Sequence, residues 1–136
     1  MAETERRDSI MLAVSNAMVR LHKEQFGRGP TRSRSAFAGS DTLVCTLESV
    51  FVPAELKLIE LGHEERVRDT RTSFQAATQA DFIAAVEQLV FRKVRAFASA
   101  VDVKANVAYE IFTFERYENG ERGASRPDSD GGADRA

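Results

Sequence analysis

The segment NVAYEIFTFER, residues 106–116, constrains the fold most strongly, because apolar side chains occupy both of its alternating sets. The two sets are Val107, Tyr109 and Ile111 on one side, and Ala108, Phe112 and Phe114 on the other. A strand that is apolar on both sides is typical of the centre of a sheet whose two faces are both covered. We therefore expect this segment to form a central strand with packing on each face.

Local periodicity upstream predicts a helix, a hairpin and a second helix. An apolar stripe of period 3.6 runs from Ile10 to Leu21 and indicates a helix that ends near Phe26. Alternating residues then favour two strands, over 31–38 and 42–50, joined by a tight turn. Proline is favoured at the first helical position and glycine just after the last, so a short helix is expected from Pro53 to Gly62.

The second half of the chain is expected to contain a long helix and two strands. Periodic apolar residues from Val67 to Leu89 indicate the helix, and the spacing of Thr78 and Asp81 indicates a restart within it. Strands follow over 93–99 and 106–116. The predicted order is α-β-β-α-α-β-β. It describes a single compact α+β domain, with a roughly four-stranded antiparallel sheet and helices packed on it, largely on one face.

Composition changes after residue 116 and divides the chain in two. Residues 1–116 carry the periodic segments, whereas residues 117–136 are rich in Gly, Ser, Asp and Arg. The second range is therefore expected to be a disordered acidic tail. It carries five acids against three arginines, which accounts for the whole net charge of -2, so the predicted domain is neutral.

Two features bear on where the protein works. The longest apolar segment, FIAAVEQLVF, is about half the ~20 residues that span a bilayer and contains Glu87. Cys45 is the only cysteine, which fits a reducing compartment better than secretion. We expect a cytoplasmic protein that does not insert into the membrane directly and reaches it, if at all, through a partner.

The glycines and proline of FGRGP are interpreted as a helix stop, formed by Gly27, Gly29 and Pro30. Phosphate-binding glycine loops lead from a strand into a helix N-terminus, whose free N–H groups face the anion. Here a helix enters the glycines with its C-terminal end, where the partial charge is negative. This polarity excludes a P-loop.

Arginines around that stop form the one electrostatic feature of the chain. Five bases lie between residues 20 and 34 against a single acid, Glu24. In TRSRS, Arg32 and Arg34 share one strand face, which favours an exposed edge strand protected by charge. The alternative is a surface for an anion or an acidic partner. The candidate residues for that surface are Arg28, Arg32, Arg34, Arg66 and Arg71.

Arg71 is expected to be partly buried, because it lies four residues after Val67 and three before Phe74 on the apolar stripe. A buried guanidinium needs a carboxylate partner. Glu87 and Glu48 are the candidates for a structural ion pair with Arg71. The other interpretation places Arg71 beside the remaining arginines around a bound anion.

The sequence shows no catalytic motif. His22 and His63 lack metal-ligand spacing, and each is interpreted as a solvated or dipole-paired histidine near a helix end. Cys45 alternates with Leu43 and Leu47 and is expected to be a buried, inert side chain. We therefore predict no metal, no cofactor and no enzymatic activity. A KH-type RNA module is disfavoured because its glycine loop would join two helices.

Four segments resemble the MpsC-like family, which is named for a Na+-translocating membrane-potential-generating system. They are IMLAVSNAMVRLHKEQFGRGP, VFVPAE, GHEERVRDTRTSF and VEQLV followed by RKV, and the resemblance covers about residues 9–115. It departs from the family pattern at Val52, where Thr is common, and at Phe91, where Gly is common. These changes weaken the expected helix start and leave the turn near residue 91 to be made differently or later.

The resemblance implies an accessory or regulatory role in membrane energisation or bicarbonate and sodium transport, alongside integral-membrane transport subunits. It implies no catalytic residue. A homodimeric sensor of a small anion is the alternative, followed by a nucleic-acid-binding module, although nucleic acid is the less favoured partner.

Overall fold

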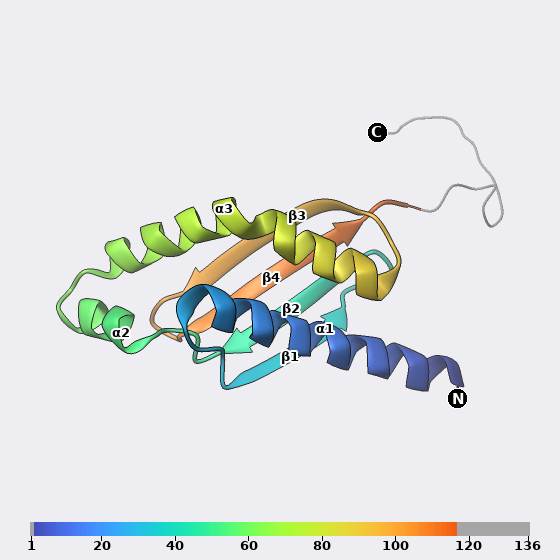
Figure 1. Ribbon diagram of the computed structural model, residues 1–136, viewed down its shortest axis with the longest axis horizontal. Helices are drawn as coiled ribbons and strands as arrows, with labels where there is room; N and C mark the ends of the chain where they lie inside the picture. The colour runs from blue at the N-terminus through green and yellow to red at the C-terminus, as the bar shows by residue number, and fades with distance from the viewer. Residues whose placement is uncertain (1, 117–136) are drawn as a thin grey trace.

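A computed structural model describes residues 2–116 of the chain, and the predicted acidic tail over 117–136 lies outside the described residues. Its elements, coloured in chain order in Figure 1, are α1 (Ala2–Phe26), β1 (Arg32–Phe37), β2 (Thr42–Glu48), α2 (Pro53–Glu60), α3 (Glu64–Val90), β3 (Val94–Asp102) and β4 (Val107–Phe114). This order confirms the predicted α+β arrangement.

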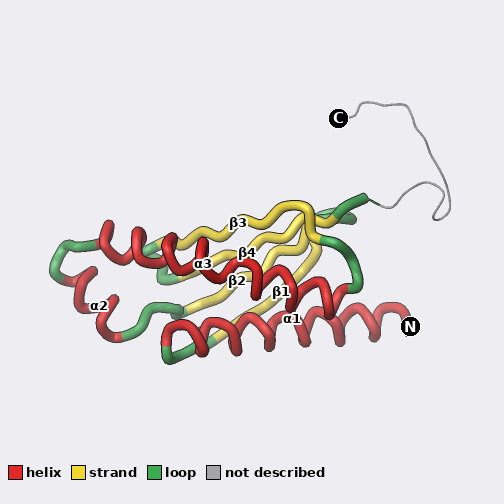
Figure 2. Tube along the Cα trace, turned by 45° about the horizontal axis from the view of Figure 1, so that its top comes forward, coloured by secondary structure: helices red, strands yellow, loops and turns green. Residues whose placement is uncertain are grey.

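The four strands form one antiparallel sheet in the order β1-β2-β4-β3. β4 is central, as expected, and pairs with β2 from Thr42↔Thr113 to Glu48↔Val107. Figure 2 shows α1 and α3 lying across the same face of the sheet. These helices lie on one face of the sheet, as expected, and the separate expectation that both faces of β4 are covered is wrong. Tyr109, on the side away from the helices, is 37% exposed. An antiparallel sheet can leave one face to solvent in this way.

The helix α1 begins at Ala2, earlier than its apolar stripe suggested. Its first turns extend beyond the sheet and are exposed, so they carry no apolar stripe that would mark them in the sequence. It ends where Gly27 takes a φ of +88°, a left-handed conformation that glycine adopts without steric cost. Gly29 packs closely against the same helix. A Cβ there would lie 3.0 Å from the carbonyl oxygen of Val19.

The strand β1 places its serines and arginines on opposite sides. Ser35 Oγ lies 2.8 Å from Ser15 Oγ of α1, and Ser33 Oγ donates to the Ser15 carbonyl at 3.2 Å. The alternating Arg32 and Arg34 are exposed on the other side of this edge strand. Contacts with α1 thus determine which side of β1 carries charge.

The two later helices differ from the expectation in detail. Val52 has no side-chain oxygen to cap α2, and the N–H of Glu55 donates instead to the Val52 carbonyl at 2.9 Å. The Glu55 side chain makes the reciprocal contact, because its Oε1 accepts from the backbone N–H of Val52 at 2.9 Å. The helix α3 is continuous, and the expected restart at Thr78 is wrong. Thr78 Oγ1 donates to the Phe74 carbonyl at 2.7 Å, a bond within the helix and not a cap.

The turn after α3 is made at Phe91 itself. Phe91 has a φ of 61° and donates its backbone N–H to the Glu87 carbonyl at 2.9 Å. The Glu87 side chain accepts from the N–H of Val94 at 2.9 Å as β3 begins. A bulky residue in the left-handed conformation is uncommon, and Phe91 is 84% exposed.

The core lies between the sheet and the helices α1 and α3. Its buried apolar residues are Val14, Ala17, Met18, Leu21, Leu43, Cys45, Leu47, Val50, Phe51, Val67, Phe82, Val86, Val103, Ala108, Phe112 and Phe114. Cys45 is fully buried, as predicted. Five polar or charged residues are buried among them: Ser15, His22, Glu55, Arg71 and Glu110.

Candidate functional site

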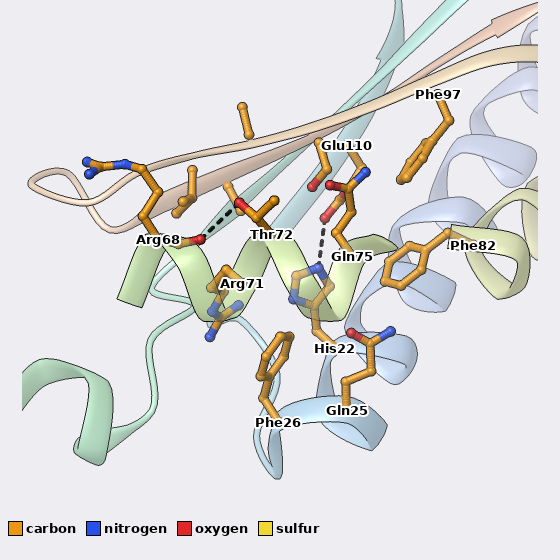
Figure 3. Close-up of a pocket in the computed structure, with 14 residues that line it drawn as sticks. His22, Gln25, Phe26, Arg68, Arg71, Thr72, Gln75, Phe82, Phe97 and Glu110 are labelled. Atoms are coloured by element: carbon orange, nitrogen blue, oxygen red, sulfur yellow. Dashed lines mark hydrogen bonds and ion pairs between the residues drawn. The ribbon is translucent and has the colours of Figure 1, made fainter. Parts of the chain in front are cut away.

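A cavity of about 270 Å3 lies between the C-terminal half of α1, the helix α3 and the strands β3 and β4 (Figure 3). Its size is near the lower end of the ~300–1,000 Å3 that small-molecule sites occupy. Its polar lining side chains are His22, Gln25, Arg68, Arg71, Thr72, Gln75, Ser99 and Glu110. The apolar part of the wall is Phe26, Phe82, Phe97, Ala100, Val101 and Ala108.

His22 and Glu110 form a buried pair in the wall of this cavity. His22 Nε2 lies 3.1 Å from Glu110 Oε2, and each side chain is 5% exposed. Figure 3 shows the two side chains pointing toward each other from α1 and from the sheet. In the tautomer that carries a proton on Nε2, His22 donates this hydrogen bond to the carboxylate.

The other polar atom of each residue is buried and has no partner. Neither His22 Nδ1 nor Glu110 Oε1 makes a hydrogen bond. A buried polar atom without a partner costs about 1–3 kcal/mol. Such atoms are rare in native proteins, and a bound water, ion or ligand beside the pair would complete their hydrogen bonds.

The pair belongs to a polar row that crosses the helix-covered face of the sheet. In register, Ser35 lies opposite Cys45, Cys45 opposite Glu110, and Glu110 opposite Ser99. Ser35 Oγ donates to Cys45 Sγ at 3.4 Å. Burial raises the pKa of the Cys45 thiol to about 12, against a lowering by the Ser35 hydrogen bond and with a smaller rise from the Glu110 carboxylate. Such a thiol is not a nucleophile at neutral pH.

Aromatic rings surround the imidazole and form the apolar side of the cavity. The His22 ring packs edge-to-face with Phe82 at 5.7 Å and lies 5.9 Å from Phe26. Phe82 in turn stacks on Phe97 of β3 at 6.2 Å. These rings hold the imidazole in place and present a flat apolar wall beside the polar pair.

Arg71 lines the same cavity, but its guanidinium is already paired. Its Nε and Nη2 donate to the two carboxylate oxygens of Glu55 at 2.7 and 2.6 Å, and Nη2 also donates to the Val50 carbonyl at 2.9 Å. The guanidinium carbon lies 3.7 Å from the centre of the Phe26 ring. Arg71 is thus buried in a structural ion pair, as predicted, but its partner is Glu55.

The expected partners Glu48 and Glu87 are therefore wrong for Arg71. Glu48 lies on β2 and pairs with Arg34 at 3.3 Å on the exposed side of the sheet. Glu87 accepts from the backbone of Val94, near the other end of α3. Glu55 was missed because it lies in the first turn of α2, where an acid has an ordinary explanation in the helix dipole.

The five candidate arginines come from three parts of the fold. Arg28, just after α1, donates to the Phe51 carbonyl at 2.6 Å. Arg32 and Arg34 lie on the edge strand β1, whereas Arg66 and Arg71 lie on α3. Of the five, only Arg71 lines the cavity, which also includes Arg68.

Sequence reasoning missed the central pair of the site. His22 was expected to be solvated or paired with the helix dipole, and the structure shows it only 4% exposed. Its position four residues after Met18 on the apolar stripe was the available signal. Glu110 likewise interrupts the apolar set of Ala108 and Phe112, which marks a buried carboxylate.

Comparison with family models decides the family. The model described as "Na+-translocating membrane potential-generating system (MpsC)" matches residues 6–116. The chain belongs to the MpsC family. The match covers α1 from Arg6 onward and all later elements, and it includes both residues of the buried pair. A search of curated proteins and a search of solved structures each returned no match.

Two further observations concern this MpsC-family fold. Within residues 2–116, no helix is both long enough and apolar enough to cross a membrane. The same residues contain no group of three or more His, Cys, Asp or Glu side chains arranged to hold a metal ion.

Proposed function

We propose that this MpsC-family protein is a non-enzymatic accessory or regulatory component of a membrane-potential-generating system, and that it responds to a small ligand bound in the cavity. The family match supports the link to membrane energisation. The observation that carries the ligand-binding part is the buried His22–Glu110 pair with its two unpartnered atoms.

The geometry favours binding over catalysis. A histidine and a carboxylate activate a nucleophile when the free imidazole nitrogen contacts a hydroxyl or thiol. Here His22 Nδ1 contacts no such group, and the buried thiol of Cys45 has its pKa raised to about 12. The pair therefore resembles a recognition element and not an activated catalytic group.

The arginine surface keeps a separate, partner-binding role in this proposal. Arg32 and Arg66 are exposed and belong to different elements, so they are suited to the rim of a protein contact more than to one enclosed anion site. We propose that such a contact brings the protein to integral-membrane transport subunits. Under the alternative of a homodimeric anion sensor, the same arginines would surround an anion shared between two copies.

The role in membrane energisation is tested in cells that lack the gene. Deletion is expected to lower the sodium-dependent part of the membrane potential, measured with a potential-sensitive dye. The wild-type gene should restore it, and Glu110→Gln should restore it poorly. The matched control is Glu48→Gln, which makes the same chemical change on the exposed side of β2 and should restore it fully. A deletion with no effect on the potential would contradict the proposal.

The ligand-binding part has its own test in a thermal-shift screen of the purified chain. A ligand that binds the folded state raises the midpoint of unfolding. Bicarbonate, phosphate, nucleotides and sodium are the first compounds, followed by small polar organic molecules. The stabilising compound should lose its effect in Glu110→Gln and keep it in Glu48→Gln. A compound that stabilises all three proteins equally binds elsewhere.

A further inference from the structure

We infer that the cavity recognises a small organic cation, a protonated amine with a compact apolar body. This inference rests on the proposed ligand-binding function and specifies the chemical class of the ligand. It follows from the hydrogen-bonding state of the cavity wall, from the charges that remain unpaired there, and from its aromatic side.

Acceptors without a donor lie in the cavity wall, beside the donors of its glutamine and serine side chains. Glu110 Oε1 is a carboxylate oxygen without a partner. In the tautomer that carries its proton on Nε2, His22 Nδ1 is a second acceptor without a partner. Thr72 Oγ1 uses its proton on the Arg68 carbonyl at 2.9 Å, which leaves only its acceptor lone pairs. A ligand that completes these contacts must bring N–H or O–H donors.

The charges of the wall point to a cation among such donors. The guanidinium of Arg71 is neutralised by two hydrogen bonds to Glu55. Arg68 pairs with Glu65 at 3.0 Å, and its side chain is 41% exposed, so its charge lies toward solvent. The Glu110 carboxylate is buried and has only an imidazole beside it. Burial strengthens its attraction for a positive group and its repulsion of an anion.

The rest of the cavity suits an apolar body. Phe82 and Phe97 form a stacked pair on one side, and Val101 of β3 also lines the space. Aromatic faces attract cations as well as apolar groups. Phe26 already carries the guanidinium of Arg71 on one face. A cavity of about 270 Å3 limits the ligand to a small molecule.

The test compares three compounds that share one body and differ in the charge of the head group. Benzylamine is a cation at neutral pH, benzyl alcohol is neutral and benzoate is an anion. Binding to the full chain is measured by calorimetry or by NMR shifts of residues in the cavity. Benzylamine is expected to bind roughly 10- to 100-fold more tightly than benzyl alcohol, because a hydrogen bond to a charged group is stronger than a neutral one. Benzoate should bind weakest.

Variants locate the site. Glu110→Gln should weaken benzylamine binding roughly 10- to 100-fold and should bring it close to benzyl alcohol. Glu48→Gln, outside the cavity, should leave all three affinities unchanged. Should Glu110→Gln fail to fold, as judged by circular dichroism, the comparison of the three compounds on the wild-type chain decides alone.

The binding measurements can overturn the cationic ligand class without overturning the proposed function. Equal binding of amine and alcohol, tighter binding of benzoate, or no binding of any of the three would overturn the cationic ligand class. The ligand screen and the membrane-potential measurement would still test the proposed function, because they assume no ligand charge. Benzylamine binding that persists in Glu110→Gln would place the cation at another site and would also overturn the inference.

Discussion

Arg71 donates from Nε and Nη2 to both carboxylate oxygens of Glu55, so the N-terminal third of α3 is tied to the first turn of α2 by a bidentate ion pair. The pair is almost fully buried, with side chains 8% and 10% exposed. Glu55 Oε1 also accepts from the N–H of Val52. The same contact therefore secures the start of α2 and its packing on α3.

Removal of one partner from this pair should destabilise the fold strongly. Arg71→Met leaves the Glu55 carboxylate buried without its main donor, and we expect a loss of about 3–5 kcal/mol in the free energy of unfolding. Chemical denaturation measures it. The matched control is Arg34→Met, whose pair with Glu48 is exposed and should contribute at most about 1 kcal/mol. Equal losses in the two variants would contradict the structural role of Arg71.

The His22–Glu110 pair should show strong coupling in a double-mutant cycle. His22→Leu leaves the carboxylate buried with neither oxygen partnered, and a loss of about 3–5 kcal/mol is expected. His22→Leu combined with Glu110→Leu removes the buried charge as well and should recover a large part of that loss. Urea denaturation of the four proteins measures the coupling. Additive effects would show that the two side chains do not interact.

Because of the Cys45 thiol, the free energy of unfolding should fall as the pH rises above 9. Its pKa is about 12 in the folded chain against an ordinary 9.0, so above pH 9 the unfolded chain loses a proton that the folded chain keeps. Its contribution is fully present below pH 9 and is lost as the pH rises toward 12, by about 1.4 kcal/mol per unit. The free-energy difference between wild type and Cys45→Ala should shrink accordingly. A difference that is constant with pH would refute the raised pKa.

Phe91→Gly should stabilise the protein. Phe91 has a left-handed backbone and is 84% exposed, so glycine relieves strain and forfeits little burial. We expect a gain of about 0.5–1 kcal/mol, seen as a rise of a few degrees in the melting temperature. Leu61→Gly is the control, because Leu61 is 62% exposed but has a φ of -83°. That variant should lose stability, and a loss in Phe91→Gly would contradict the strain argument.

Much of the fold was predictable because its signals are local. The stripe that ends at Phe26 predicted α1, the two-residue alternation predicted the strands, and Pro53 marked the start of α2. The errors arose where a local rule met a tertiary contact. Thr78 has the spacing of a cap, yet it lies inside a helix that is held by its packing. The helices were expected largely on one face of the sheet, where they lie, whereas the double covering expected for β4 was wrong because partly exposed apolar residues look like buried ones in a sequence.

The sequence alone, through its residue types and their periodicities, determined three features. They are the order of the elements, the central place of β4 and the burial of Arg71 and Cys45. Only the tertiary structure decided which charged groups meet. His22 and Glu110 are 88 positions apart, and they meet because β4 pairs between β2 and β3 beneath α1. Arg71 meets Glu55 because α2 folds back on α3. Local periodicity identifies the buried face of each element, whereas the partner across that face depends on register and packing between elements distant in the chain.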